Sequence, residues 1–129
     1  MKPKFYPIPD KINVFVTNDF GYDLSDAKRF IRGDGEIIAI TEGRVSIKDL
    51  KKLANKMMYS LNEMQETDFL LVSGNSVVAS LASSIVFNKY KRLNLLVFDA
   101  REHRYDAQTI TLDGLGNVGL NKKDGNIKQ

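Results

Sequence analysis

Residues 68–88, DFLLVSGNSVVASLASSIVFN, decide the fold of this chain. The stretch begins with a short apolar run, continues through a polar turn at residues 73–76, and ends in a segment of helical length. This order predicts a buried strand that leads directly into a helix. The first N–H groups of such a helix have no partner within it, and they point above the edge of the sheet. The stretch is therefore a natural place for an anion or a nucleotide.

Length and composition restrict the class of protein. The 129 residues, of which 43% are hydrophobic, are enough for one core and do not suggest a second domain. The net charge of +3 is only mildly basic, so nucleic acid is not indicated as a partner. The absence of cysteine excludes disulfides, thiol nucleophiles and thiolate metal sites, and the single histidine excludes a metal site built on imidazoles. Because the apolar runs are strand-sized and no signal peptide is recognisable, we expect no membrane contact and a cytoplasmic location, in the host if a phage encodes the chain.

The two ends of the chain differ from its centre. Three prolines without N–H groups predict an extended arm over residues 1–11. Residues 12–112 are predicted to form a single α/β domain, and residues 113–129 a tail rich in Gly, Asn and Lys. Within the tail, GLGNVG matches the dinucleotide fingerprint letter by letter, but the helix, strand and acidic residue that should follow it are missing. We interpret this match as a glycine-rich segment without a binding role.

Strand and helix patterns alternate along the central part. Apolar runs predict parallel strands, helical spacing predicts the helices between them, and a loosely alternating last segment predicts a strand that doubles back. The predicted strands are residues 12–16, 36–41, 68–73, 93–98 and 105–112, and the predicted helices are residues 24–31, 50–64 and 77–86. Because the crossovers are long enough for helices, this order predicts a three-layer Rossmann-like α/β sandwich. Its sheet would be mostly parallel, with about four strands and an antiparallel C-terminal edge strand.

The predicted helix at residues 50–64 has a cap and a basic face. Ser46 and Asp49 precede it with the spacing of a capping box. Lysines line its outer face at positions 48, 51, 52 and 56. Such a face can follow phosphates, but on most helices it is only solvated, and we interpret it here as a solvated surface.

Two apolar segments predict burial or assembly. Residues 93–98, LNLLVF, have the unbroken apolar pattern of a strand that is buried on both faces. Residues 75–88 carry no charge, which predicts a helix that packs beneath another element or against a partner chain. Together with the apolar arm, this helix leads us to expect a homo-oligomer, most simply a dimer.

One combination of residues suggests a hydrolase. Ser76 in the strand-to-helix turn, Asp99 after the next strand and His103 just beyond it would meet at the carboxyl edge of a parallel sheet. A nucleophile elbow needs glycine on both sides of its serine, however, and Val78 takes the second place. Asp99 and His103 also belong to one short turn, where an orienting hydrogen bond between them is hard to form. A small hydrolase is therefore the least favoured function, and we assign no catalytic residue and no cofactor.

A polar rim follows the predicted strands at their carboxyl ends. Asn18 and Asp19 follow the first strand, and Glu42 follows the second. The candidate ligand-binding residues on this rim are Thr41, Ser73, Gly74, Asn75, Ser76, Asp99, Arg101 and Arg104. Backbone N–H groups suit a phosphate, hydroxyls suit ribose or phosphate oxygens, and arginines neutralise charge. The alternative is that the same residues only cap a helix, allow a tight turn and solvate a loop.

Four segments of the chain carry a resemblance to known proteins. They are YDLSDA at 22–27, ITEG at 40–43, DFLLVSGN at 68–75, and LLVFD at 95–99 with Arg104 and Tyr105. On these segments the chain resembles a group of small uncharacterised Rossmann-like proteins of bacteriophages and mobile elements, over residues 12–106. This resemblance implies no activity. The strand, Ser-Gly turn and helix are also similar in plan to Rossmann-like sensor domains that bind cyclic oligonucleotides.

Two functions of different class follow. The first is a small phage-like accessory protein that acts by binding a protein or by self-assembly rather than by catalysis. The second is a nucleotide-binding module, a sensor or sponge for a nucleotide or cyclic nucleotide, which uses the carboxyl edge of the sheet. A thermal-shift screen separates them, because a ligand at about a hundred times its dissociation constant stabilises its binder by about 2.7 kcal/mol.

Overall fold

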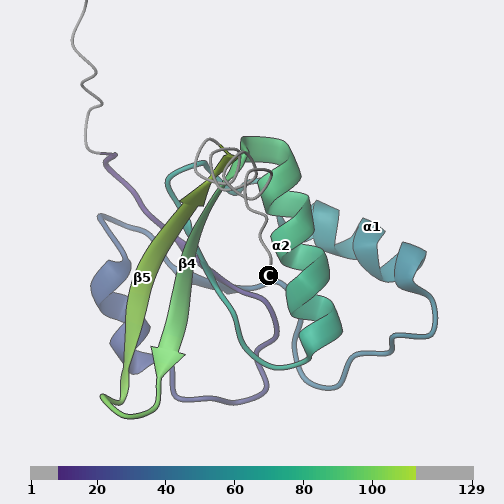
Figure 1. Ribbon diagram of the computed structural model, residues 1–129, viewed down its shortest axis with the longest axis horizontal. Helices are drawn as coiled ribbons and strands as arrows, with labels where there is room; N and C mark the ends of the chain where they lie inside the picture. The colour runs from purple at the N-terminus through teal and green to yellow at the C-terminus, as the bar shows by residue number, and fades with distance from the viewer. Residues whose placement is uncertain (1–8, 113–129) are drawn as a thin grey trace, which may run out of the picture.

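A five-stranded sheet is the centre of the computed structural model, which describes residues 9–112 (Figure 1). The elements are β1 (Val14–Val16), η1 (Ser25–Phe30), β2 (Ile37–Ala39), α1 (Leu50–Ser60), β3 (Phe69–Leu71), α2 (Ser76–Tyr90), β4 (Arg92–Asp99) and β5 (Arg104–Thr111). The strands lie in the order β2-β1-β3-β4-β5, and β5 runs antiparallel to β4 while the other pairs are parallel. The prediction of a mostly parallel sheet with an antiparallel C-terminal edge is thus confirmed.

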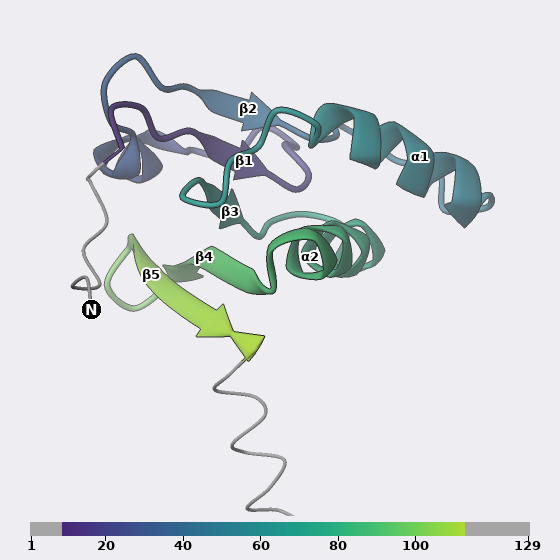
Figure 2. The same cartoon turned by 90° about the horizontal axis from the view of Figure 1, so that it is seen from above.

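Two helices cover one face of the sheet, and the short helix η1 covers part of the other (Figure 2). α1 and α2 pack on the face that carries Phe15 and Leu70. η1 packs on the face that carries Val14 and Leu71. Because alternate residues of a strand point to opposite faces, the central strands β1 and β3 are largely buried on both sides. The Rossmann-like grouping itself stays a prediction.

The predicted arm and tail lie mostly outside the described residues. Residues 1–8 of the arm and the whole tail at 113–129, with its glycine motif, are not among them. The division of the chain into arm, domain and tail therefore stays a prediction.

The predicted helix at residues 24–31 is a 3₁₀ helix. Backbone bonds such as the one from Ala27 N–H to the Leu24 carbonyl, at 3.0 Å, span three residues instead of four. Leu24 provides no side-chain cap, and Arg32 pairs with Ile12 in an antiparallel bridge directly after the helix. This early return to extended backbone leaves the segment too short for regular α-helical bonding.

α1 is capped by Asp49, so the predicted capping box that starts at Ser46 is wrong. The Asp49 side chain accepts a hydrogen bond from Lys52 N–H at 3.1 Å. Ser46 Oγ instead accepts one from Lys48 N–H, at 3.4 Å, within the preceding loop. An Asp directly before the first helical residue caps the helix without help from Ser46.

β4 is buried on both faces only in its first half. Leu93 and Leu96 are buried, but Val97 is 43% exposed and Phe98 46% exposed, so the prediction of burial throughout is wrong. β3 ends at the residue that pairs with Leu96, and β4 continues past it as a two-stranded hairpin with β5 (Figure 1). A strand outside the middle of a sheet loses part of the cover that the unbroken apolar pattern suggests.

α2 contains the uncharged segment that predicted a helix and extends past it to include Lys89, and it packs against β4 and α1. Val78, Ala82 and Val86 are buried on its inner side, whereas Ser80 and Ser84 are exposed. Of the two outcomes predicted for this helix, packing against another element of the chain is the one observed.

Candidate functional site

The strand order places a polar cluster where open α/β sheets bind ligands. From β1 the chain adds β2 on one side of the sheet and then β3 on the other, so the strand order reverses between β1 and β3. This place is the switch point of the sheet, and open α/β sheets bind their ligands there, beyond the carboxyl ends of the strands. Thr17 and Asn18 follow β1 there, and residues 73–75 follow β3. The predicted binding residues that meet at the switch point are Thr41, Ser73, Gly74 and Asn75.

The side chain of Asn18, which is only 3% exposed, fills the switch point. Its Nδ2 donates hydrogen bonds to Thr41 Oγ1 and to the Gly43 carbonyl, both at 3.0 Å. Its Oδ1 accepts a hydrogen bond from Asn75 N–H at 3.2 Å. An anion bound at this point would use the same N–H group. The Asn18 amide therefore stands where a ligand oxygen would lie.

The hydroxyl groups of the cluster also have partners within the chain. Thr17 Oγ1 donates to the Ser73 carbonyl at 2.8 Å and accepts from Ser73 N–H at 2.9 Å. Ser73 Oγ donates to the Asn18 carbonyl, and Thr41 Oγ1 donates to the Thr17 carbonyl, both at 2.8 Å. These bonds satisfy buried polar groups and tie together the ends of β1, β2 and β3.

Asn75 and Gly74 shape the turn before α2. Asn75 Oδ1 accepts a hydrogen bond from Val77 N–H at 2.8 Å, so Asn75 is the N-cap of the helix. Gly74 has a φ of +76°, and a Cβ atom there would lie 2.3 Å from Asn18 Oδ1. Ser76 is the first residue of α2 and is exposed. Ligand binding by these residues stays a prediction.

Asp99, Arg101 and Arg104 lie in a different place, at the turn between β4 and β5. Asp99 Oδ1 accepts hydrogen bonds from Arg101 N–H at 2.9 Å and from Glu102 N–H at 3.2 Å, which stabilise the turn. Arg104 begins β5 and is exposed. Within residues 9–112, no hydrogen bond joins these side chains to the cluster at the switch point. The predicted site residues therefore form two groups.

The three residues of the hydrolase hypothesis are also separate. Within the part of the chain that the structure describes, no hydrogen bond joins Ser76, Asp99 and His103 to one another. His103 has a φ of +55°, and its ring packs edge-on against Phe98 with 6.5 Å between the ring centroids. The carboxylate of Asp99 thus supports the turn and does not orient the imidazole.

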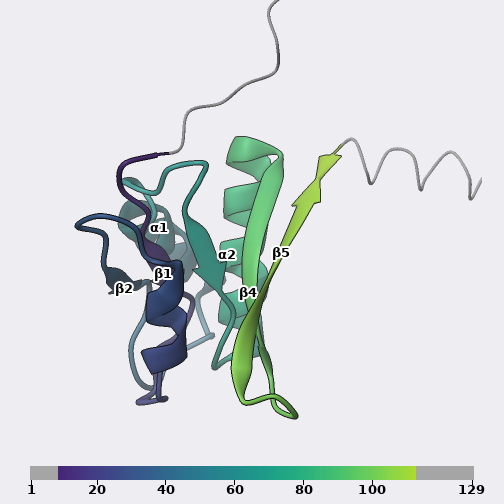
Figure 3. The same ribbon diagram turned by 90° about the vertical axis from the view of Figure 1, so that its left-hand side faces the viewer.

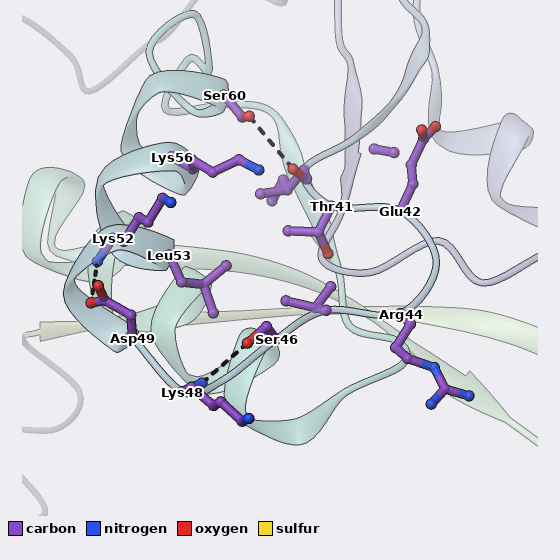
Figure 4. Close-up of a pocket in the computed structure, with 13 residues that line it drawn as sticks. Thr41, Glu42, Arg44, Ser46, Lys48, Asp49, Lys52, Leu53, Lys56 and Ser60 are labelled. Carbon is purple, nitrogen blue, oxygen red and sulfur yellow. Dashed lines mark hydrogen bonds between the residues drawn. The ribbon is translucent and has the colours of Figure 1, made fainter.

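A groove of about 760 Å³ opens beside the polar cluster, between α1 and the loop that follows β2 (Figure 4). Its lining residues are Ala39, Ile40, Thr41, Glu42, Arg44, Val45, Ser46, Lys48, Asp49, Lys52, Leu53, Lys56 and Ser60. Ile40 and Leu53, 6% and 7% exposed, contribute apolar surface from the core. Thr41 belongs both to the groove and to the polar cluster, so the two adjoin each other.

Basic side chains outnumber acidic ones in this groove. The cations that line it are Arg44, Lys48, Lys52 and Lys56. The carboxylates of Glu42 and Asp49 oppose them, which leaves a formal excess of two positive charges. Among residues 9–112, Arg29 forms an ion pair with Asp26, and none of the groove cations takes part in one. Figure 4 shows Lys52 and Lys56 on α1 across from Thr41.

This arrangement suits a ligand that combines anionic groups with an apolar part. Ammonium and guanidinium groups form charge-assisted hydrogen bonds with phosphates, and the apolar surface can contact a ring. The described residues contain no group of three or more His, Cys, Asp or Glu side chains that could hold a metal ion. The sequence shows these lysines, but a lysine-lined helix face is usually only solvated, so the sequence alone does not assign them to a site. The spacing of Lys48, Lys52 and Lys56 by four residues was the signal that could have separated them from Lys51.

The fold and the groove together define a small α/β protein with a mixed five-stranded sheet and a basic groove at the carboxyl end of β2. The chain belongs to the family of phage Pam3 gp32-like proteins, which matches residues 12–112. This membership confirms the predicted relationship to phage proteins. No curated protein and no solved structure matches the chain. None of the helices in the described ranges is long and apolar enough to cross a membrane.

Proposed function

We propose that this chain is a phage accessory protein that acts by binding rather than by catalysis, with the basic groove as its ligand site. One observation carries the proposal: four cations line the groove, and none has an ion-pair partner among the described residues. Positive charge gathered in a concave site concentrates anions from solution. The excess of two charges in the groove is most of the net +3 of the whole chain.

The ligand class that fits the groove best is a nucleotide. Lysine ammonium groups bind phosphates as point charges, and the guanidinium of Arg44 can bind one with two parallel hydrogen bonds. Ser46 contributes a hydroxyl, and Leu53 contributes apolar surface for a base. The second candidate function, a sensor or sponge for a nucleotide or cyclic nucleotide, is therefore favoured at the groove. At the switch point, Asn18 already occupies the position of an anion.

The Rossmann-like grouping is part of the same proposal. It is supported by the parallel strands β1 to β4, by the reversal of strand order between β1 and β3, and by cover on both faces of the sheet. Sheets of this kind bind ligands beyond the carboxyl ends of their strands, and the groove lies at that end of β2.

Thermal shift with inorganic tripolyphosphate, ATP and a cyclic dinucleotide tests the ligand class. We expect at least one of them to raise the melting temperature, because a ligand at about a hundred times its Kd adds about 2.7 kcal/mol to the free energy of unfolding. Lys52→Ala should weaken the binding of that compound about tenfold or more, as the loss of one charge-assisted bond does. Lys51→Ala is the matched control and should leave the Kd unchanged, since Lys51 does not line the groove. Isothermal titration calorimetry measures the Kd of both variants.

Several outcomes would contradict this function. Equal effects of Lys51→Ala and Lys52→Ala would show that the basic face is only solvated. The absence of a shift with all three compounds would exclude a phosphate-binding groove. Affinity that does not fall with added salt would also argue against it, because exposed charges are screened at moderate ionic strength.

A further inference from the structure

β5 is the outer strand of the sheet, with β4 as its neighbour (Figure 3). In an antiparallel pair, residues alternate between bonding to the neighbouring strand and facing away from it. Leu112 N–H donates to the Lys91 carbonyl at 3.2 Å, so every second residue before Leu112 also bonds to β4. The backbone groups of Tyr105, Ala107 and Thr109 therefore point outward.

η1 covers the beginning of this outer edge. Asp26 Oδ2 accepts a hydrogen bond from Tyr105 N–H at 2.7 Å, and Arg29 Nη2 donates one to the Tyr105 carbonyl at 2.5 Å. An ion pair of 3.0 Å holds Asp26 and Arg29 together. Both outward backbone groups of Tyr105 are occupied, so another strand cannot pair with β5 at this residue.

The outer edge is open at Ala107 and Thr109. Within residues 9–112, the outward N–H and C=O groups of these two residues have no partner. Residues 107–110 contain neither a charge nor a proline, which are common devices that keep an edge strand from pairing. Ile110 is 38% exposed, and Val97 on the same face is 43% exposed. The open stretch thus offers unpaired backbone groups beside exposed apolar side chains.

We propose that a second copy of the chain pairs with β5 through this open stretch, antiparallel and about a two-fold axis at Gln108. Ala107 of one copy then lies opposite Thr109 of the partner subunit, and each such pair exchanges both of its backbone hydrogen bonds. The sheets of the two copies become one continuous sheet. η1 excludes registers that are shifted toward Tyr105, because they would require the outward groups of that residue, which are occupied.

A second copy fits this edge better than an unrelated strand. The open stretch is short, and a two-fold axis at its centre lets each copy use all of its open groups on the same groups of the other. Residues 107–110 carry no charge, so two copies do not repel each other there. A two-fold contact closes on itself, which limits the assembly to a dimer. The groove adjoins β2 at the opposite edge of the sheet, so it stays open in this dimer.

Introduced cysteines test the position of the axis, because the chain has none of its own. In the proposed pair the two Gln108 side chains are directly opposite, with Cβ atoms about 5 Å apart, so Gln108→Cys should form a disulfide-linked dimer on mild oxidation. Asp106→Cys is the matched control on the same strand and face. Its two copies would lie about 14 Å apart, which is beyond the reach of a disulfide. Equal crosslinking of both variants, or none with Gln108→Cys, in non-reducing gel electrophoresis overturns the proposal.

Thr109→Pro provides a second test of the pairing. It removes an outward N–H group and the hydrogen bond of 3.0 Å from Thr109 Oγ1 to Asn94 Oδ1, but no backbone hydrogen bond to β4, and proline is tolerated on edge strands in that position. We expect the wild-type protein to sediment as a dimer of the 14.6 kDa chain at tens of micromolar, and folded Thr109→Pro to sediment as a monomer. A monomeric wild type, or a folded variant that remains dimeric, would exclude pairing through β5. Circular dichroism reports folding, and if the variant unfolds, the pair of cysteine variants decides.

Discussion

Asn18 determines how the switch point of the sheet is used. A buried amide is costly unless its hydrogen bonds are made, and the side chain of Asn18 bonds to Thr41, Gly43 and Asn75. By giving Asn75 N–H a side-chain oxygen, the chain closes the place where an open α/β sheet would bind an anion. In the function proposed above, anions bind instead to the side-chain cations of the adjoining groove.

Replacing Gly74 measures how tightly Asn18 fills this space. Gly74 and Gly43 have φ values of +76° and +66°, but a Cβ at Gly74 would lie 2.3 Å from Asn18 Oδ1, whereas one at Gly43 would meet nothing within 4 Å. Both Gly→Ala changes should cost about 1–2 kcal/mol for the left-handed backbone. Gly74→Ala should cost about 1–3 kcal/mol more, because the Asn18 side chain must move and loses hydrogen bonds. Equilibrium unfolding in urea measures the stability of both variants. Equal losses of stability would mean that the side chain of Asn18 moves away at no cost.

At the scale of elements, η1 depends on its neighbours for its position. A 3₁₀ helix has weak internal bonding, so tertiary contacts decide where it lies. Ala27 anchors it in the core, and Asp26 and Arg29 anchor it on Tyr105, the second residue of β5. The hydrogen bond from Tyr105 N–H lowers the pKa of Asp26, and the Arg29 side chain lowers it further. Burial raises the pKa of the Tyr105 hydroxyl, with the charges of Asp23 and Asp26 as further causes.

The docking of η1 on β5 should weaken in acid. Because the folded protein lowers the pKa of Asp26 from its ordinary value of 3.8, its contribution to stability is complete above 3.8 and is lost as pH falls through the lower folded value. An NMR titration of the Asp26 carboxyl should therefore have its midpoint below 3.8. Arg29→Ala should raise this midpoint only part of the way, since the Tyr105 N–H bond remains. A wild-type midpoint at or above 3.8 would be incompatible with that hydrogen bond.

In the whole molecule, the two proposed surfaces lie at opposite edges of the sheet. The groove adjoins β2, and the pairing edge is β5, with β1, β3 and β4 between them. At a strand spacing of about 4.8 Å, β2 and β5 are about 19 Å apart. Surfaces at this separation that share no side chains are expected to act independently. A dimer through β5 would therefore carry one groove at each of its outer edges.

Ligand binding and pairing should thus be separable by mutation. We expect Thr109→Pro to bind the phosphate compound with the wild-type Kd and with one ligand per chain, as measured by isothermal titration calorimetry. Lys52→Ala should weaken that binding and leave the sedimentation coefficient of the dimer unchanged. A monomeric Thr109→Pro protein with clearly weaker binding would show instead that the groove depends on the partner subunit.

The sequence by itself determined the order of strands and helices, the reversal of the last strand and the relationship to phage proteins. Apolar periodicity is a local property, so residues 68–88 alone are enough to predict β3, the turn after it and α2. Local spacing also placed the lysines of α1 on one side of a helix. It could not show that the loop between β2 and α1 forms a groove with them, because the path of that loop depends on how α1 packs against the sheet.

Only the tertiary structure decided which polar groups remain open to a ligand or a second chain. Asn18 closes the switch point through a bond to a residue 57 positions away, and Arg29 covers the start of β5 through a bond that spans 76 positions. Without the side chain of Asn18, the N–H group of Asn75 in the same Ser-Gly-Asn turn would lose its partner. Such contacts depend on which strands become neighbours, and no pattern within a single helix or strand encodes that choice.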